Sequence, residues 1–188
     1  MKLVATDLPG VVVVEADVLR DHRGFLLETY HADKFHGMGI SGTFVQDNHS
    51  HSIRGTLRGL HLQVARPQAK LIRALSGEIY DVAVDVRRGS PTFGRWVGVT
   101  LTAASFRQLY IPEGFAHGFA VISERADVEY KCTDVYHPAS ELVIRWDDPA
   151  LAIRWPITEP LLSDRDRSAP TLADSEDRLP LYESSPTS

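Results

Sequence analysis

The sequence is poor in cysteine and contains no long apolar run. Cys132 is the single cysteine among 188 residues, which excludes an internal disulfide and any zinc site built from several cysteines. No stretch approaches the roughly 18 consecutive apolar residues that a membrane-spanning helix needs. Residues 1–7 also lack the apolar core of a signal peptide. We therefore expect a cytoplasmic protein with no membrane partner.

Lysine and net positive charge are also scarce. Four lysines and sixteen arginines stand against 25 acidic residues, which gives a formal net charge of −5. This balance argues against a protein that coats nucleic acid or binds anionic membranes. Because arginine presents a planar fork of donors that matches carboxylate and phosphate groups, the excess of arginine over lysine leaves anionic small molecules open as ligands.

Apolar residues in the middle of the chain alternate with the two-residue period of β-strands. Such runs lie at 80–86, 96–101 and 127–132, and turns rich in glycine, proline and serine separate them at 76–77, 89–91, 112–114 and 137–138. Short strands at this spacing predict an all-β fold, an antiparallel sandwich or barrel. Helical signals are weak, and residues 31–38 are the main candidate for a short helix.

The length of the chain predicts a single domain over residues 1–188. From Ser163 onward the chain becomes rich in serine, proline and aspartate. We expect this segment to wrap the barrel first and then to fray at about residues 181–188.

Polar side chains are densest between residues 46 and 73, where histidine, arginine, asparagine, glutamine and lysine stand beside apolar strand positions. For any one arginine a solvated surface position is the better interpretation, but the group as a whole indicates the lining of a cleft. A second segment, 111–119, places His117 just after a Pro-Glu-Gly turn. Taken alone, a histidine in this setting is more often a hydrogen-bonded core residue than a site residue.

Turns followed by histidines in two strands resemble the cupin barrel. Many cupins hold a metal with His-x-His, a glutamate a few residues later and a third histidine. Here His61 is followed by Gln63 at the place of the second ligand, and Lys70 lies in the stretch where a glutamate would be expected. Two histidines and a cation make a poor site for a divalent metal. We therefore predict no metal and no other cofactor.

Five motifs in the same order resemble the dTDP-4-dehydrorhamnose 3,5-epimerases, which are metal-free cupin-type enzymes of deoxysugar biosynthesis. They are RGLH at 58–61, PQAK at 67–70, GSPTFG at 89–94, IPEGFAHGF at 111–119 and LSDRD at 162–166. The resemblance extends over residues 10–180. It implies a cupin-type jelly roll, a double-stranded β-barrel with a few short helices. It also implies inversion of C3 and C5 of dTDP-4-dehydro-6-deoxy-D-glucose, which gives dTDP-4-dehydro-L-rhamnose.

The resemblance implies a role for each of four catalytic residues. His61 matches the base that removes a proton beside the ketone, and imidazole suits this task because its ordinary pKa of about 6.5 lies near working pH. Asp166 matches the carboxylate that orients the base. Lys70 matches the residue at the C4 oxygen, and Tyr130 matches the acid on the far face of the ring. The strand alternation turns Tyr130 to the same, inward side as Val128 and Cys132.

The resemblance also implies the substrate contacts and the assembly. Arg23, Arg58 and Arg165 match the diphosphate clamp; Gln46, Asn48 and His117 match polar contacts to phosphate or sugar; Glu28 and Tyr136 match contacts to the base. In the family the N-terminal segment crosses to the partner subunit, which implies a homodimer with exchanged segments. The chain departs from the family at Leu26 and Leu62, where aromatic residues are usual, and we expect both changes to remove π surface near the ligand.

Three alternatives stay open at this point. The same residues would serve an epimerase that acts only at C3 or only at C5, in a specialised deoxysugar pathway. A non-catalytic cupin that binds nucleotide sugars would not need a matched base and acid. A metal-dependent cupin oxygenase is disfavoured by the ligand count.

Overall fold

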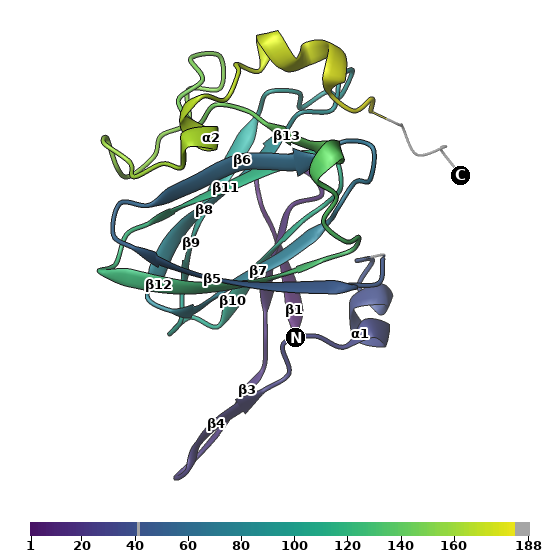
Figure 1. Cartoon of the computed structure of the whole chain (residues 1–188). Coiled ribbons are helices and arrows are strands. Elements are labelled where there is room, and N and C mark those ends of the chain that lie inside the picture. The colour runs from purple at the N-terminus through teal and green to yellow at the C-terminus, as the bar shows by residue number, and fades with distance from the viewer. Residues whose placement is uncertain (41, 183–188) are drawn as a thin grey trace.

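Two antiparallel sheets face each other and form a barrel in the computed structural model, which describes residues 1–40 and 42–182 (Figure 1). The six-stranded sheet runs in the order β1 (Lys2–Ala5), β2 (Val12–Glu15), β10 (Arg107–Ile111), β7 (Lys70–Ser76), β12 (Arg125–Cys132) and β5 (Gln46–Ile53). The five-stranded sheet runs in the order β13 (Glu141–Val143), β6 (Leu57–Gln63), β11 (Phe115–Val121), β8 (Glu78–Asp85) and β9 (Trp96–Thr102). The all-β prediction is confirmed.

The inward faces of both sheets form the main core. Ile72 and Val128 come from the six-stranded sheet, while Ile79 and Leu101 come from the five-stranded sheet, and all four are fully buried in one cluster. Burial of each such side chain contributes about 1.5–3 kcal/mol to folding. Tyr130 packs against the same cluster, so its predicted inward orientation is confirmed.

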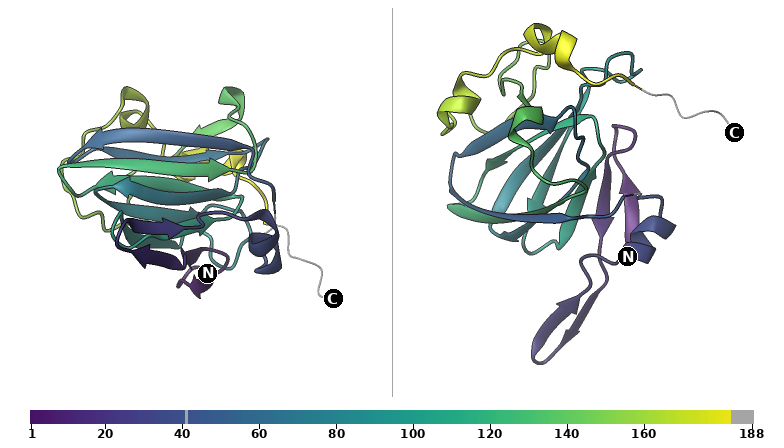
Figure 2. Two further views of the ribbon diagram at one scale, coloured as in Figure 1. Left: turned by 90° about the horizontal axis from the view of Figure 1, so that it is seen from below. Right: turned by 45° about the vertical axis from the view of Figure 1, so that its right-hand side comes forward.

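The C-terminal segment covers the outer face of the five-stranded sheet (Figure 2). It contains α2 (Asp164–Arg167) and η2 (Ala173–Arg178), and it follows η1 (Pro138–Ser140) and β13. Leu172 and Leu179 of this segment, together with Leu151 before it, are buried against the outward side of the sheet. The sheet is therefore covered on both faces, which explains why six of the eight residues of β8 are buried.

The first two residues of the predicted frayed end are held against the barrel. The bond from Tyr182 N to Arg88 O measures 2.9 Å, and Leu181 forms a β-bridge with Arg88, so neither residue is frayed. The rest of the expected tail, residues 183–188, lies outside the described residues.

A hairpin of β3 (Val18–Asp21) and β4 (Gly24–Leu27) extends away from the barrel (Figure 1). The predicted short helix follows as α1 (Ala32–Gly37), which buries Phe35 beside the barrel. Among residues 1–40 and 42–182, no helix is long and apolar enough to cross a membrane.

Candidate active site

Two neighbouring strands, β6 and β11, carry the two histidines singled out in the sequence. His117 pairs directly with His61, but the next pair along the strands joins Phe119 to Arg58. Strand β6 therefore has one more residue than β11 between these pairs, which is a β-bulge. Side chains three positions apart on a regular strand face opposite sides of the sheet. Because of the extra residue, Arg58 and His61 line the same cavity.

Glycine is required where the two strands approach each other at this bulge. A Cβ on Gly59 would lie 2.5 Å from the Cα of Gly118, and the φ of Gly59 is +127°. Both the space and the backbone conformation exclude a larger residue. The glycines of the RGLH and HGF stretches therefore shape the floor beside His61.

His61 is paired with a carboxylate from the C-terminal segment. Its Nε2 lies 2.6 Å from Oδ1 of Asp166, which is 3% exposed at the start of α2. Ser163 caps this helix and donates its hydroxyl to Oδ2 of Asp166 at 2.8 Å. Burial alone would raise the pKa of Asp166, but the hydrogen bonds that it accepts from His61 and Ser163 hold that pKa below its ordinary value. The arrangement leaves Nδ1 of His61 free of the pair.

The opposite sheet contributes Lys70 and Tyr130 to the same cavity. Lys70 is buried, and its Nζ lies 3.4 Å from the backbone oxygen of His61. Burial lowers the pKa of Lys70 and raises the pKa of Tyr130. The cavity has a volume of about 140 Å³ and is lined by Ser50, Arg58, His61, Lys70, His117, Phe119 and Tyr130. The four residues predicted to be catalytic thus meet at one place, although they come from four separate elements.

A second opening continues from this cavity toward solvent. Its lining adds Gln46, Asn48, Tyr136 and Glu141 to His61, Lys70 and Tyr130. Gln46 donates to Oδ1 of Asn48 at 3.0 Å, and the backbone N of Tyr136 donates to Oε1 of Gln46 at 2.7 Å. The predicted polar contacts of β5 therefore lie beside the reactive groups.

Two of the three predicted clamp arginines lie at the edge of the cavity. Arg58 donates through Nε and Nη2 to the hydroxyl of Ser52, both at 3.1 Å. Arg165 makes an ion pair with Glu141, with 2.5 Å between Nη2 and Oε2. Arg58 and Arg165 also line one surface pocket together with His61 and Asp166.

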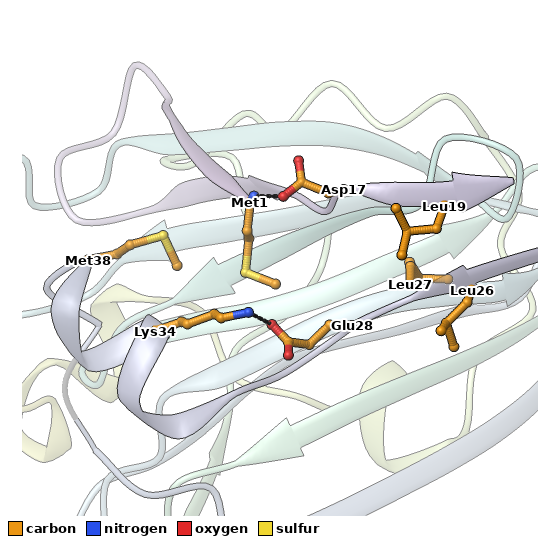
Figure 3. A pocket seen from close by; sticks show the side chains of 8 residues that line it. All are labelled: Met1, Asp17, Leu19, Leu26, Leu27, Glu28, Lys34 and Met38. Atoms are coloured by element: carbon orange, nitrogen blue, oxygen red, sulfur yellow. Dashed lines mark hydrogen bonds and ion pairs between the residues drawn. The ribbon is translucent and has the colours of Figure 1, made fainter.

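Arg23 and Glu28 are the two predicted residues that the single chain does not bring to this place. Arg23 lies at the turn of the hairpin, where it pairs with Asp21 at 2.6 Å. Glu28 follows β4 and pairs with Lys34 of α1 at 2.7 Å. Glu28 lines a different and larger cavity of about 750 Å³. Figure 3 shows it there with Met1, Met38 and the hairpin leucines.

Sequence reasoning missed three polar residues around the histidines. Glu141 places Oε1 3.9 Å from Nδ1 of His61, on the side away from Asp166, and accepts the hydroxyl of Tyr136 at 2.7 Å. Asp81 pairs with His117, and Ser163 caps the helix of Asp166. The Ser-x-x-Asp spacing is a helix-start signature that would have found Ser163. No local pattern distinguishes Asp81 or Glu141 from other strand carboxylates.

The expectation for Leu62 is wrong. Leu62 is 3% exposed and packs with Leu142 and Leu151 on the outward side of β6, away from the cavity. Replacing an aromatic residue by leucine there changes core packing, and it removes no π surface from the site. Leu26, by contrast, is 69% exposed on the hairpin.

Gln63, at the place of the second metal ligand of other cupins, already makes hydrogen bonds to the backbone. Gln63 donates to the backbone oxygen of Arg66 at 2.8 Å and accepts the backbone N–H of His137 at 2.6 Å. No group of three or more histidine, cysteine, aspartate or glutamate residues within 1–40 and 42–182 is arranged to hold a metal ion. A metal-free site stays a prediction.

Comparison with known proteins identifies the family. The profile of the dTDP-4-dehydrorhamnose 3,5-epimerases matches residues 5–174. A Pseudomonas aeruginosa protein of that name is 51% identical over 178 residues, which is 94% of this chain and 98% of the relative. The chain belongs to the dTDP-4-dehydrorhamnose 3,5-epimerase family.

Two further family members are compared with this chain in length and in fold. A Neisseria gonorrhoeae protein named dTDP-4-dehydrorhamnose 3,5-epimerase is 51% identical over 177 residues, but the match covers 94% of this chain and only 54% of that relative, so this chain spans about half its length. The crystal structure of a Legionella pneumophila dTDP-6-deoxy-D-glucose-3,5-epimerase in complex with dTDP-4-keto-L-rhamnose has a TM-score of 0.94 at 47% identity and covers 97% of this chain and 99% of its own. This likeness supports the predicted cupin-type jelly roll for the described residues.

Proposed function

We propose that this protein inverts C3 and C5 of dTDP-4-dehydro-6-deoxy-D-glucose to give dTDP-4-dehydro-L-rhamnose. One observation carries the proposal: a histidine of one sheet, paired with a carboxylate of α2, faces a buried ammonium and a phenol of the other sheet across one cavity. A ring bound between the sheets has a base on one face and an acid on the other. Epimerisation requires this arrangement, because the proton must leave from one face and return to the opposite one.

His61 is the proposed base. Because Nε2–H is donated to Asp166, the lone pair lies on Nδ1, and Nδ1 removes the proton from the carbon beside the ketone. The electron pair of the broken C–H bond moves into an enolate with its charge on the C4 oxygen. Asp166 stabilises the imidazolium that forms. A free imidazole of ordinary pKa would serve poorly without this partner, because its tautomer would not be fixed.

Lys70 and Tyr130 complete the cycle. The buried ammonium of Lys70 stabilises the charge on the enolate oxygen, an interaction that is strong because water is excluded around it. Tyr130 donates its proton to the carbon from the far face, and the C4 ketone re-forms. Burial raises the pKa of Tyr130, which keeps the phenol protonated before the transfer. His61 then releases its proton to solvent and Tyr130 takes one up, and repetition at the second carbon gives the doubly inverted sugar.

The diphosphate and the base extend from the cavity toward solvent. Arg58 and Arg165 offer planar donors to the diphosphate, and Gln46, Asn48 and Tyr136 line the way out. Arg165 must leave Glu141, or share it, when the nucleotide binds, since the two are paired at 2.5 Å.

A homodimer with exchanged N-terminal segments supplies the remaining contacts in this proposal. The β3–β4 hairpin extends from the barrel and exposes Leu19 (68%), Phe25 (55%) and Leu26 (69%) (Figure 1). A two-stranded hairpin is marginally stable alone, and exposed apolar residues of this kind favour an interface. The hairpin would bring Arg23 and Glu28 to the partner's cavity. The cytoplasmic location stays a prediction.

Deuterium exchange tests the reaction. The protein, treated with a chelator, is incubated in deuterium oxide with dTDP-4-dehydro-6-deoxy-D-glucose, and mass spectrometry and NMR locate the label. We expect exchange at C3 and C5, and none at either carbon with His61→Ala. Exchange at one carbon only would identify a single-site epimerase. If the nucleotide binds without any exchange, the protein is a binding module and the proposal fails.

Mixed dimers test the exchange of hairpins. Arg23→Ala and His61→Ala chains are each purified, mixed, unfolded and refolded together. If the hairpin crosses, the mixed dimer contains one site with both residues intact, and random assembly restores about a quarter of the wild-type activity. No recovery, although light scattering shows mixed dimers, would mean that Arg23 acts within its own chain.

A further inference from the structure

A second imidazole–carboxylate pair lies beside the first. Nε2 of His117 lies 2.7 Å from Oδ1 of Asp81, and Asp81 is fully buried on β8. His117 pairs across the strands with His61 and lines the same cavity. The two histidines are therefore neighbours, each with its own aspartate.

The two pairs differ in their exposure. The side chain of His61 is 31% exposed, whereas that of His117 is 7% exposed. Burial lowers the pKa of His117, and the nearby positive charge of Lys70 acts in the same direction. Asp81 opposes these effects, but the pKa stays below its ordinary value. The lowered pKa of His117 favours its neutral form.

A neutral imidazole has one N–H donor and one acceptor nitrogen. The nitrogen bonded to a carboxylate must be the donor, so Nε2 carries the hydrogen and Nδ1 is the acceptor. We propose that Asp81 is a positioning residue that fixes this tautomer, and that Nδ1 of His117 accepts a hydrogen bond from a ring hydroxyl of the hexose. The sequence left phosphate and sugar open as the partner of His117. An ionised diphosphate has no hydrogen to donate to Nδ1, so it does not fit.

Asp85, four residues further along β8, shows what a carboxylate with only a structural role looks like on this strand. It is equally buried, and it accepts hydrogen bonds from Arg87, Ser90 and Thr92. Asp81 has His117 as its hydrogen-bond partner, and its Oδ2 has none among the described residues. An unpaired buried oxygen costs stability. The contrast supports a role for Asp81 in the cavity beyond packing.

The tautomer is measured directly in the wild-type protein, without any activity. Long-range ¹H–¹⁵N spectra of ¹⁵N-histidine-labelled protein distinguish the two neutral tautomers from the imidazolium. The sequence has eight histidines, and the signals of His117 are those missing from a His117→Gln sample. We expect the Nε2–H tautomer at neutral pH. The Nδ1–H tautomer or a doubly protonated ring would overturn the proposal.

Substrate analogues test the hydroxyl contact, which rests on the proposed function. Exchange at C5 is measured with the parent sugar nucleotide and with its 2-deoxy and 3-deoxy forms. Loss of one neutral hydrogen bond raises KM for one analogue by about 3- to 10-fold. Asp81→Asn removes most of that difference, because the amide accommodates either tautomer of His117. Equal KM values for all three sugars, or an unchanged penalty in Asp81→Asn, would overturn it.

Asp85→Asn is the matched control for loss of a buried carboxylate on β8. Both variants lower the melting temperature, but only Asp81→Asn changes the ratio of KM values between parent and deoxy sugars. If Asp81→Asn does not fold, the tautomer spectra of the wild-type protein and its KM values for the deoxy analogues still test the proposal. Absence of exchange with the parent sugar would refute the proposed function and leave the tautomer measurement standing.

Discussion

The pairing of His61 with Asp166 gives the sharpest prediction about the reaction. Asp166 is 3% exposed and lies 2.6 Å from the imidazole, so the hydrogen bond is short, shielded from water and made by a charged group. A hydrogen bond to a charged group contributes about 1.5–3 kcal/mol. At about 1.4 kcal/mol for each factor of ten, Asp166→Ala lowers kcat by about 10- to 150-fold.

Asp166→Asn should lower kcat more than Asp166→Ala does, although asparagine is closer in shape to aspartate. The amide can turn its NH₂ toward Nε2, which places the imidazole hydrogen on Nδ1 and removes the base. A comparable substitution in serine proteases costs about 10⁴-fold in kcat. We therefore expect Asp166→Asn to lose between 10² and 10⁴-fold, measured as the initial rate of deuterium uptake.

Asp164→Asn is the control for this pair of variants. Asp164 lies on the same short helix but is exposed, so its variant should keep the wild-type rate. Circular dichroism checks that all three variants are folded. If Asp166→Asn takes up deuterium within a factor of three of wild type, the carboxylate neither orients nor stabilises His61, and the reasoning fails.

Three further predictions concern the acid, the strand contact and the outer face of the sheet. Tyr130→Phe should retain deuterium uptake better than net inversion, as judged by NMR of the product; equal loss of both would contradict its role as the acid. Gly59→Ala should lower the free energy of unfolding in urea by about 2–4 kcal/mol, because the new Cβ meets Gly118 and the φ of Gly59 is positive. Gly37→Ala is the control: a Cβ there has nothing within 4 Å, so its free energy of unfolding should stay within about 1 kcal/mol of wild type. Asp127 accepts hydrogen bonds from a serine and two histidines, which lower its pKa from 3.8 to about 2. Because the pKa of Asp127 is lower in the folded protein, its ionised carboxylate stabilises the fold above pH 3.8, and this stabilisation is lost as the pH falls toward 2. Between pH 4 and pH 2 the melting temperature should therefore fall more steeply for wild type than for Asp127→Asn.

The alternation of apolar residues was sufficient to predict strands and an all-β barrel. A period of two is a local property, and burial on one face of a sheet enforces it. The motifs then pointed to His61, Lys70 and Asp166, because each of these residues lies in its own short motif. His61, Lys70 and Tyr130 line one cavity, and Asp166 is bonded to His61.

Pairings between distant segments could not be read in the same way. Asp81 and Glu141 join the site through strand register, and register depends on which strands become neighbours. Leu62 was misplaced for a related reason: β6 is covered on both faces, so alternation alone did not say which face meets the cavity.

The sequence by itself determined the strand periods, the absence of disulfides and the set of reactive side chains. Only the tertiary structure decided which of them meet, because one extra residue at Gly59 turns Arg58 and His61 into the same cavity. It also separated the two histidines chemically. His61 and His117 are the same residue type on neighbouring strands and each bonds its own aspartate, but the side chain of His61 is 31% exposed and that of His117 only 7%.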